Sequence, residues 1–273
     1  MRPPTLDDLR LRSQKPHHRV IGNWFARRVA RPSAIYGTWL AIRMNLTANQ
    51  VTLLALLAAL SGAVALGSGT AKGFVAAVLL GHLAYWLDHV DGQVARWHGS
   101  ASLDGVYLDY LLHHAWSLSQ GFALGYGLTS LTGEPLWSVA GFAIALGWAL
   151  LSLHNDCRYK AVFQRIKSTR QSFRVNGGSG SRPISGFSWP SFGFGFLTWM
   201  GAKACEPHVV LLTLTGLAVV AGVSAVSWIV LWKAYVVAMA LGAPVLALGR
   251  IGRTVARRQV EHEFERWFEP LDN

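Results

Sequence analysis

Long uninterrupted apolar runs constrain this chain more than any other feature. VTLLALLAALSGAVALG at 51–67 and VVLLTLTGLAVVAGVSAVSW at 209–228 approach the roughly 20 residues that an α-helix needs to cross a bilayer. Only 14% of the 273 residues are charged, whereas a typical soluble domain has about 25%. The sequence therefore predicts an integral membrane protein.

The apolar segments predict an all-α fold with six transmembrane helices. We expect these spans at 49–67, 74–97, 103–127, 135–157, 207–227 and 229–250. Residues 21–43 mix aromatic side chains with arginines, which favours an N-terminal amphipathic helix lying at the membrane interface. The composition of residues 1–20 is typical of a disordered segment.

The distribution of the 25 Lys and Arg residues indicates the orientation. Nine lie at or before Arg43, eight between Arg158 and Lys203, and five between Arg250 and Arg266. Basic clusters beside spans mark the cytoplasmic side and attract anionic lipid head groups, so we expect no nucleic-acid partner. We expect an inner (cytoplasmic) membrane protein with both termini and the active site facing the cytoplasm. Its predicted parts are an N-terminal and interfacial segment (1–48), a six-span membrane domain (49–250) and a cytoplasmic C-terminal tail (251–273).

Polar residues interrupt the second and third spans near their cytoplasmic ends. On a helix, a spacing of i, i+3, i+4 and i+7 makes one stripe. The first such stripe consists of Asp88, Asp91, Gly92 and Ala95. The second stripe, spaced by four, consists of Gly105, Asp109 and His113. Because only a short turn joins the two helices, we expect the stripes to face each other.

This pattern of acids favours a metal site. A charged group within a span costs about 2.5–3.5 kcal/mol on the insertion scale, so the three acids need compensation. Oxygen ligands around a water-accessible cavity suit Mg²⁺, Mn²⁺ or Ca²⁺. The alternative is a set of interfacial acids that pair with Arg96 and nearby basic residues.

The same residues carry a family resemblance. The order Asp88-x2-Asp91-Gly92-x2-Ala95-Arg96-x8-Gly105-x3-Asp109 resembles the signature of the CDP-alcohol phosphatidyltransferases. NLTANQVTLL at 45–54 is similar to the family's segment before its first span, with Ala48 where proline is usual. The resemblance implies an enzyme of phospholipid biosynthesis that moves a phosphatidyl or phospho-alcohol group from a CDP-linked donor to an alcohol and releases CMP. CDP-diacylglycerol is the expected donor, although the reverse arrangement, with CDP-choline or CDP-ethanolamine and a diacylglycerol acceptor, stays open.

The resemblance also implies roles for individual residues. Asp88, Asp91 and Asp109 would hold divalent metal, Mg²⁺ or Mn²⁺, at the pyrophosphate of the donor. Gly92, Ala95 and Gly105 would make room for the cytidine nucleotide, which Asp88 also contacts. Arg96 would orient the acids or the phosphates as part of the catalytic machinery. A homodimer is expected on the same ground.

One position departs from the family signature. The signature ends in a further aspartate, thought to be the base that deprotonates the acceptor, and this chain has His113 there. Imidazole titrates near neutral pH and is a competent general base, but it is a poor ligand for Mg²⁺. Either His113 is the base, or the donor or acceptor differs from the family norm, or the chain is an inactive relative that binds nucleotide or lipid.

A second candidate site follows the fourth span. HNDCRYK at 154–160 places Arg158 and Lys160 at the membrane–cytoplasm boundary, where they could bind the phosphates of the donor or of an anionic acceptor. Positive-inside anchoring explains the same two residues. A transporter that couples ions through intramembrane carboxylates is a third functional class, but the acids lie near one face rather than at the midplane.

Overall fold

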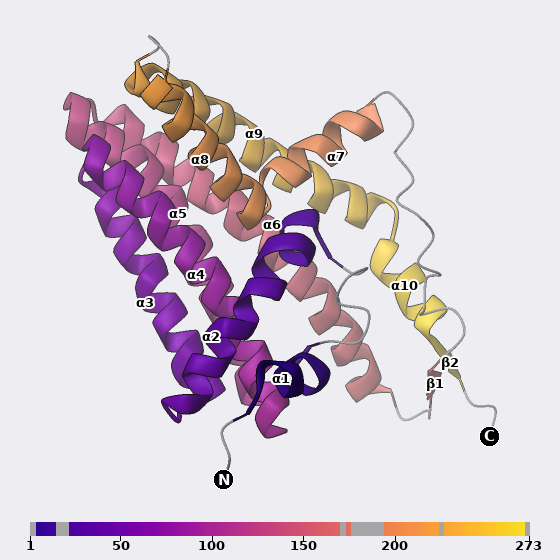
Figure 1. The fold of residues 1–273 in the computed structure, drawn as a ribbon. Coiled ribbons are helices and arrows are strands. Elements are labelled where there is room, and N and C mark those ends of the chain that lie inside the picture. The colour runs from indigo at the N-terminus through magenta and orange to yellow at the C-terminus, as the bar shows by residue number, and fades with distance from the viewer. Residues whose placement is uncertain (1–3, 15–21, 170–172, 176–193, 224–226, 271–273) are drawn as a thin grey trace.

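The structure is a computed structural model that describes residues 4–14, 22–169, 173–175, 194–223 and 227–270. Six helices run side by side and form a bundle (Figure 1). They are α3 (Ala48–Gly67), α4 (Ala71–His98), α5 (Leu103–Thr132), α6 (Leu136–Ser168), α8 (Pro207–Val223) and α9 (Trp228–Ala256). The shorter elements are α1 (Leu6–Arg12), the π-helix η1 (Ala26–Ala30), α2 (Arg31–Arg43), α7 (Phe194–Ala204), α10 (Gln259–Trp267) and the strands β1 (Phe173–Val175) and β2 (Phe268–Pro270). The predicted helical character of the chain is confirmed.

Several of the described helices are suited to cross a membrane. α3, α4, α6 and α9 are long and apolar enough, and the pair Thr198–Ala204 and Pro207–Val223, bent by 74°, adds a fifth if it counts as one span. α5 is not among them, although it has 30 residues and packs between α3 and α6. Its polar residues, which include Asp109, His113 and Gln120, lower its apolar character. The prediction of an integral membrane protein is thus confirmed by several long apolar helices.

Glycines let the bundle helices approach one another closely. A Cβ atom added at Gly121 of α5 would lie 2.7 Å from the Cα of Ala145 in α6. At the turn after α3, Gly69 has φ +68°, and a Cβ there would lie 2.5 Å from the carbonyl oxygen of Gly127. Small residues at helix contacts are typical of membrane bundles. In lipid, no hydrophobic effect drives helices together, so close backbone packing has to stabilise their contacts.

The N-terminal region is more structured than its composition suggested. α1 begins at a capping box in which Thr5 and Asp8 bond each other's backbone N–H groups. Leu9 and Ser13 are fully buried, and α1 contacts both α2 and α4. The prediction of disorder is therefore wrong for residues 4–14, because contacts with distant helices order this short segment. Residues 1–3 and 15–20 lie outside the described part of the chain.

η1 and α2 occupy the region predicted as an interfacial helix. α2 crosses the C-terminal half of α4 (Figure 1). Gly37 makes the crossing close, because a Cβ there would lie 2.8 Å from the Val90 side chain. The outward face of α2 carries Tyr36 and Leu40, both more than half exposed. The predicted N-terminal amphipathic helix is therefore not confirmed and stays a prediction.

The C-terminal segment folds back onto the extension of α6. β1 and β2 pair antiparallel, with Phe173 opposite Pro270 and Val175 opposite Phe268. Trp267 stacks on Tyr159 with ring centroids 6.1 Å apart. The region predicted as a tail therefore contains α10 and β2, which are anchored to α6.

Candidate active site

A cavity of about 470 Å³ lies where α4 and α5 approach the N-terminal helices. It brings together the two stripes predicted from the sequence. The first stripe contributes Asp88, Asp91, Gly92 and Ala95, and the adjacent Arg96 also lines the cavity. From the second stripe come Gly105, Asp109 and His113. The predicted juxtaposition is thus present, while the chemical role of each residue stays a prediction.

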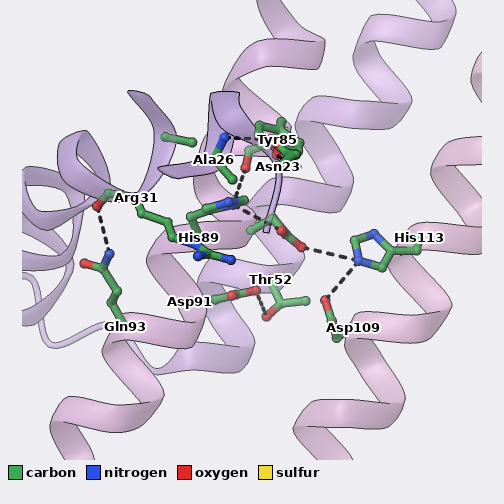
Figure 2. Close-up of polar contacts among 12 residues, drawn as sticks. Asn23, Ala26, Arg31, Thr52, Tyr85, His89, Asp91, Gln93, Asp109 and His113 are labelled. Atoms are coloured by element: carbon green, nitrogen blue, oxygen red, sulfur yellow. Dashed lines mark hydrogen bonds and ion pairs between the residues drawn. The ribbon is translucent and has the colours of Figure 1, made fainter. Parts of the chain in front are cut away.

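Two carboxylates and one imidazole converge in this cavity. His113 Nε2 lies 3.8 Å from Asp88 Oδ1 and 3.7 Å from Asp109 Oδ1 (Figure 2). One ligand atom from each of these three residues lies within 4.8 Å of the other two. Carboxylate oxygens suit Mg²⁺ or Mn²⁺, whereas imidazole is a weaker match for Mg²⁺. The three side chains fit a divalent cation, and His113 has the geometry either to ligate it or to exchange a proton beside it.

Asp91 lies one helical turn further along α4 and has a different environment. Its Oδ2 accepts a 2.7 Å hydrogen bond from Thr52 Oγ1 of α3 (Figure 2), and the residue is only 8% exposed. Asp91 therefore lines the same cavity but does not belong to the three-residue cluster. The hydroxyl of Thr52 satisfies one of its oxygens.

His89 supports Asp88 from the opposite side. Its Nδ1 lies 3.3 Å from Asp88 Oδ2 and 3.1 Å from the carbonyl oxygen of Tyr85. Both partners are acceptors, so Nδ1 must carry a hydrogen and donate to them. The His89 ring also packs on the Tyr85 ring, with centroids 4.8 Å apart. Asp88 is thus fixed between two imidazoles, those of His89 and His113.

The N-terminal elements complete the wall of the cavity. Arg96 Nε donates to the carbonyl oxygen of Ser13, at 2.5 Å. Arg31 of α2 also lines the cavity, and its carbonyl oxygen accepts a 3.1 Å hydrogen bond from Gln93 Nε2. Gln93 Oε1 in turn accepts from Thr38 Oγ1, at 2.9 Å. Sequence reasoning missed this layer, because no motif links these positions.

Neither Arg158 nor Lys160 lines the cavity. Arg158 forms an ion pair with Glu263 of α10, and Lys160 is exposed on the extension of α6. Close to them, His114 Nε2 contacts Asp156 Oδ2 at 2.7 Å. The structure therefore does not bring this second candidate site to the carboxylate cluster. The suggested phosphate-binding role stays a prediction.

Comparisons with known proteins agree with the resemblance seen in the signature residues. Residues 45–171 match the family model described as CDP-alcohol phosphatidyltransferase, which covers α3 to α6 and the whole signature. Among solved structures, the fold is similar to Mycobacterium tuberculosis phosphatidylinositol phosphate synthase (PgsA1) with CDP-DAG bound. That similarity has a TM-score of 0.52 and 18% identity, and it covers 82% of this chain and 92% of that chain. A search of curated proteins gives no match. Residues 45–171 therefore match the CDP-alcohol phosphatidyltransferase family, the transferase family of phospholipid biosynthesis that the signature predicted.

Proposed function

We propose that the protein transfers a phosphatidyl group from CDP-diacylglycerol to an alcohol and releases CMP, in a reaction that needs a divalent metal. The observation that carries this proposal is the cavity itself, in which the signature acids, Arg96 and His113 lie on facing helices. A protein of similar fold, PgsA1, has been solved with CDP-DAG bound, which supports this donor.

The acidic residues are the proposed metal ligands. Asp88 and Asp109 would hold Mg²⁺ or Mn²⁺, which leaves His113 Nε2 beside them to accept a proton, and Asp91 lines the same cavity. When bound, the cation supplies charge neutralisation at the diphosphate and at the departing phosphate of CMP. His89 would keep Asp88 in the orientation needed for binding, because it donates a hydrogen bond to that carboxylate.

His113 is the proposed general base. Its side chain is 46% exposed, so an alcohol from solution can reach Nε2. As Nε2 accepts the hydroxyl proton, the alcohol oxygen forms its bond to the phosphorus of the phosphatidyl group. The bond between that phosphorus and the CMP oxygen breaks, and CMP leaves with the electron pair. Asp88 and Asp109, both within 4 Å of Nε2, stabilise the imidazolium that results.

The rest of the cavity suits a nucleotide diphosphate. Gly92, Ala95 and Gly105 expose little side-chain bulk along its wall, which leaves room for the cytidine moiety. Arg31 and Arg96 both line the cavity, and guanidinium groups bind phosphate oxygens in a bidentate manner. The geometry does not select one alcohol, so the acceptor is defined only as a hydroxyl compound.

We further propose that α5 and α8 complete a six-span arrangement with the cavity and both termini on the cytoplasmic side of the inner membrane. The basic clusters at the N-terminus, after α6 and after α9 support this orientation. A homodimer stays a prediction from the family resemblance.

The test is an assay for CMP release. Purified protein is incubated with CDP-diacylglycerol and a panel of alcohols, with Mg²⁺, Mn²⁺ or a chelator. We expect CMP only with metal, and its loss in Asp88→Asn and Asp109→Asn. If no donor and alcohol pair gives CMP while nucleotide binding persists, the chain is a non-catalytic relative and the proposal fails.

Substitutions at His113 test the assignment of the base. We expect His113→Ala to abolish turnover and His113→Asp to keep part of it, since a carboxylate can also accept the proton. The neighbouring His114 contacts Asp156 instead of lining the cavity, so His114→Ala is the matched control and should keep most of the turnover. Unchanged turnover in His113→Ala would rule out this role.

A further inference from the structure

α1 lies outside residues 45–171, the part of the chain that matches the family model, yet it reaches the cavity. Leu9 is 0% exposed, and Arg12 places its guanidinium carbon 5.8 Å from the centre of the Trp97 ring on α4. Gln14, directly after the helix, lines the cavity. α1 is therefore docked against α2 and α4, and the residue that follows its C-terminal cap lines the proposed donor site.

The end of α1 presents an acceptor to Arg96. Ser13 is the C-terminal capping residue of the helix and is fully buried, and its hydroxyl donates to the carbonyl oxygen of Leu9. The last carbonyl oxygens of a helix have no intrahelical donor and carry partial negative charge, which favours a nearby cation. The carbonyl oxygen of Ser13 finds its donor in Arg96 Nε, at 2.5 Å.

This contact restricts how the guanidinium of Arg96 can be used. The group is a planar fork of five N–H donors, and Ser13 takes the one on Nε. The terminal nitrogens stay on the side of Gly92, where Nη1 and Nη2 would lie 3.3 and 3.6 Å from an added Cβ. Gly92 lines the cavity, so the Nη1–Nη2 edge borders the space proposed for the diphosphate.

We propose that α1 is a positioning element for the donor site: it holds Arg96 through the carbonyl oxygen of Ser13, so that the Nη1–Nη2 edge faces the diphosphate of the CDP-linked donor. This inference rests on the proposed function. Without α1, the long side chain of Arg96 would sample several rotamers. The entropy lost when the donor orders that side chain would then weaken donor binding.

Two leucines of α1 provide a matched test. Leu9 is 0% exposed and anchors the helix, whereas Leu11 on the same helix is 84% exposed. We expect Leu9→Glu to undock α1 and raise the KM for CDP-diacylglycerol about tenfold, the usual range for a lost hydrogen bond to a charged group. Leu11→Glu introduces the same charge and should keep the wild-type KM. Equal KM values for Leu9→Glu and wild type would overturn the inference.

A second pair of variants separates positioning from general stabilisation. Arg96→Lys removes the Nε–H group and the planar fork, so adding Leu9→Glu to it should not raise KM further. If Leu9→Glu raises KM by the same factor in both backgrounds, α1 acts independently of Arg96 and the inference is wrong. Leu9→Ala replaces Leu9→Glu if the charged variant does not fold, as judged by thermal unfolding.

Binding of CDP-diacylglycerol in mixed micelles gives a readout that does not require turnover. The dissociation constants of the four variants (Leu9→Glu, Leu11→Glu, Arg96→Lys and the double variant) should follow the same order as their KM values. If wild-type protein binds the donor but releases no CMP, the proposed function fails while the role of α1 is still decided by affinity. If it releases CMP and Leu9→Glu binds the donor as wild type does, only the role of α1 fails.

Discussion

At the scale of single residues, Asp91 depends on a hydroxyl from another helix. Thr52 Oγ1 donates to Asp91 Oδ2 at 2.7 Å in a buried setting, and the two residues are 39 positions apart. Removing a partner from a buried polar group leaves that group desolvated and unsatisfied, which costs about 1–3 kcal/mol or more if it is charged.

We therefore expect Thr52→Val, which keeps the shape but loses the hydroxyl, to lower the free energy of unfolding by roughly 1–3 kcal/mol. Denaturant titration in detergent measures this quantity. Thr52→Ser retains the donor and is the control, which should stay near the wild-type value. A Thr52→Val protein as stable as wild type would show that water replaces the lost hydroxyl.

How much of the site the sequence could predict depends on where its residues lie. Asp88, Asp109 and His113 were predictable, because helical spacing places them on stripes of two consecutive helices. Ser13 and Thr52 were not, because they contact the cavity residues Arg96 and Asp91 from 83 and 39 positions away in the chain. His89 was not predicted either, for a different reason. It does not belong to the stripe, and only the rotamer of its side chain brings Nδ1 to Asp88.

At the scale of elements, the bundle depends on close contacts between helices. Gly121 allows α5 and α6 to approach, because an added Cβ would lie 2.7 Å from the Cα and 2.8 Å from the nitrogen of Ala145. Backbone atoms cannot move aside as a flexible side chain can, so any side chain at this position forces the two helices apart. Gly216 in α8 is a contrasting case, with no heavy atom within 4 Å of an added Cβ.

The same substitution should therefore have opposite effects at these two glycines. We expect Gly121→Ala to lower the unfolding free energy by about 1–3 kcal/mol through overpacking. Gly216→Ala should raise it by up to about 1 kcal/mol, because alanine restricts the unfolded chain and favours the helix. Denaturant titrations of the two variants provide the measurement, and shifts of the same sign would contradict this account of the helix contact.

Element types were easier to predict than element contacts. The apolar runs gave the long helices, and Ser102, which caps α5, lies in the predicted turn between the second and third spans. The pairing of β1 with β2 had no sequence signal, because two three-residue strands 93 or more positions apart carry no pattern of their own. α1 was missed for the same physical reason, since contacts with α2 and α4 and not local composition determine its order.

At the scale of the whole molecule, the cavity is formed by a smaller part of the sequence than the helix bundle. The described residues that line the cavity run from Gln14 to His113, and α6 to α10 contribute none of them. The later helices instead pack against the earlier ones, as α6 does on α5 and α9 does on α6. The proposed donor site is thus built by the first half of the chain.

The proposed orientation predicts which end of α6 is accessible from each side of the membrane. In a background where Cys157 and Cys205 are replaced by serine, Glu134→Cys and Ser168→Cys place one thiol near each end of the helix. A membrane-impermeant maleimide applied to right-side-out vesicles should label Glu134→Cys at once and Ser168→Cys only after permeabilisation. The reverse pattern would invert the topology, and labelling of both without permeabilisation would mean that α6 does not span the membrane.

Both described ends of the chain are engaged with the rest of the protein. α1 is docked beside the cavity, and β2 is paired to β1 just beyond α6. An affinity tag or fluorescent protein fused directly to α1 or β2 would therefore disturb a segment that contacts the rest of the protein. The exposed turn at Gly133, between α5 and α6, offers an alternative insertion point for a purification handle or an imaging fiducial.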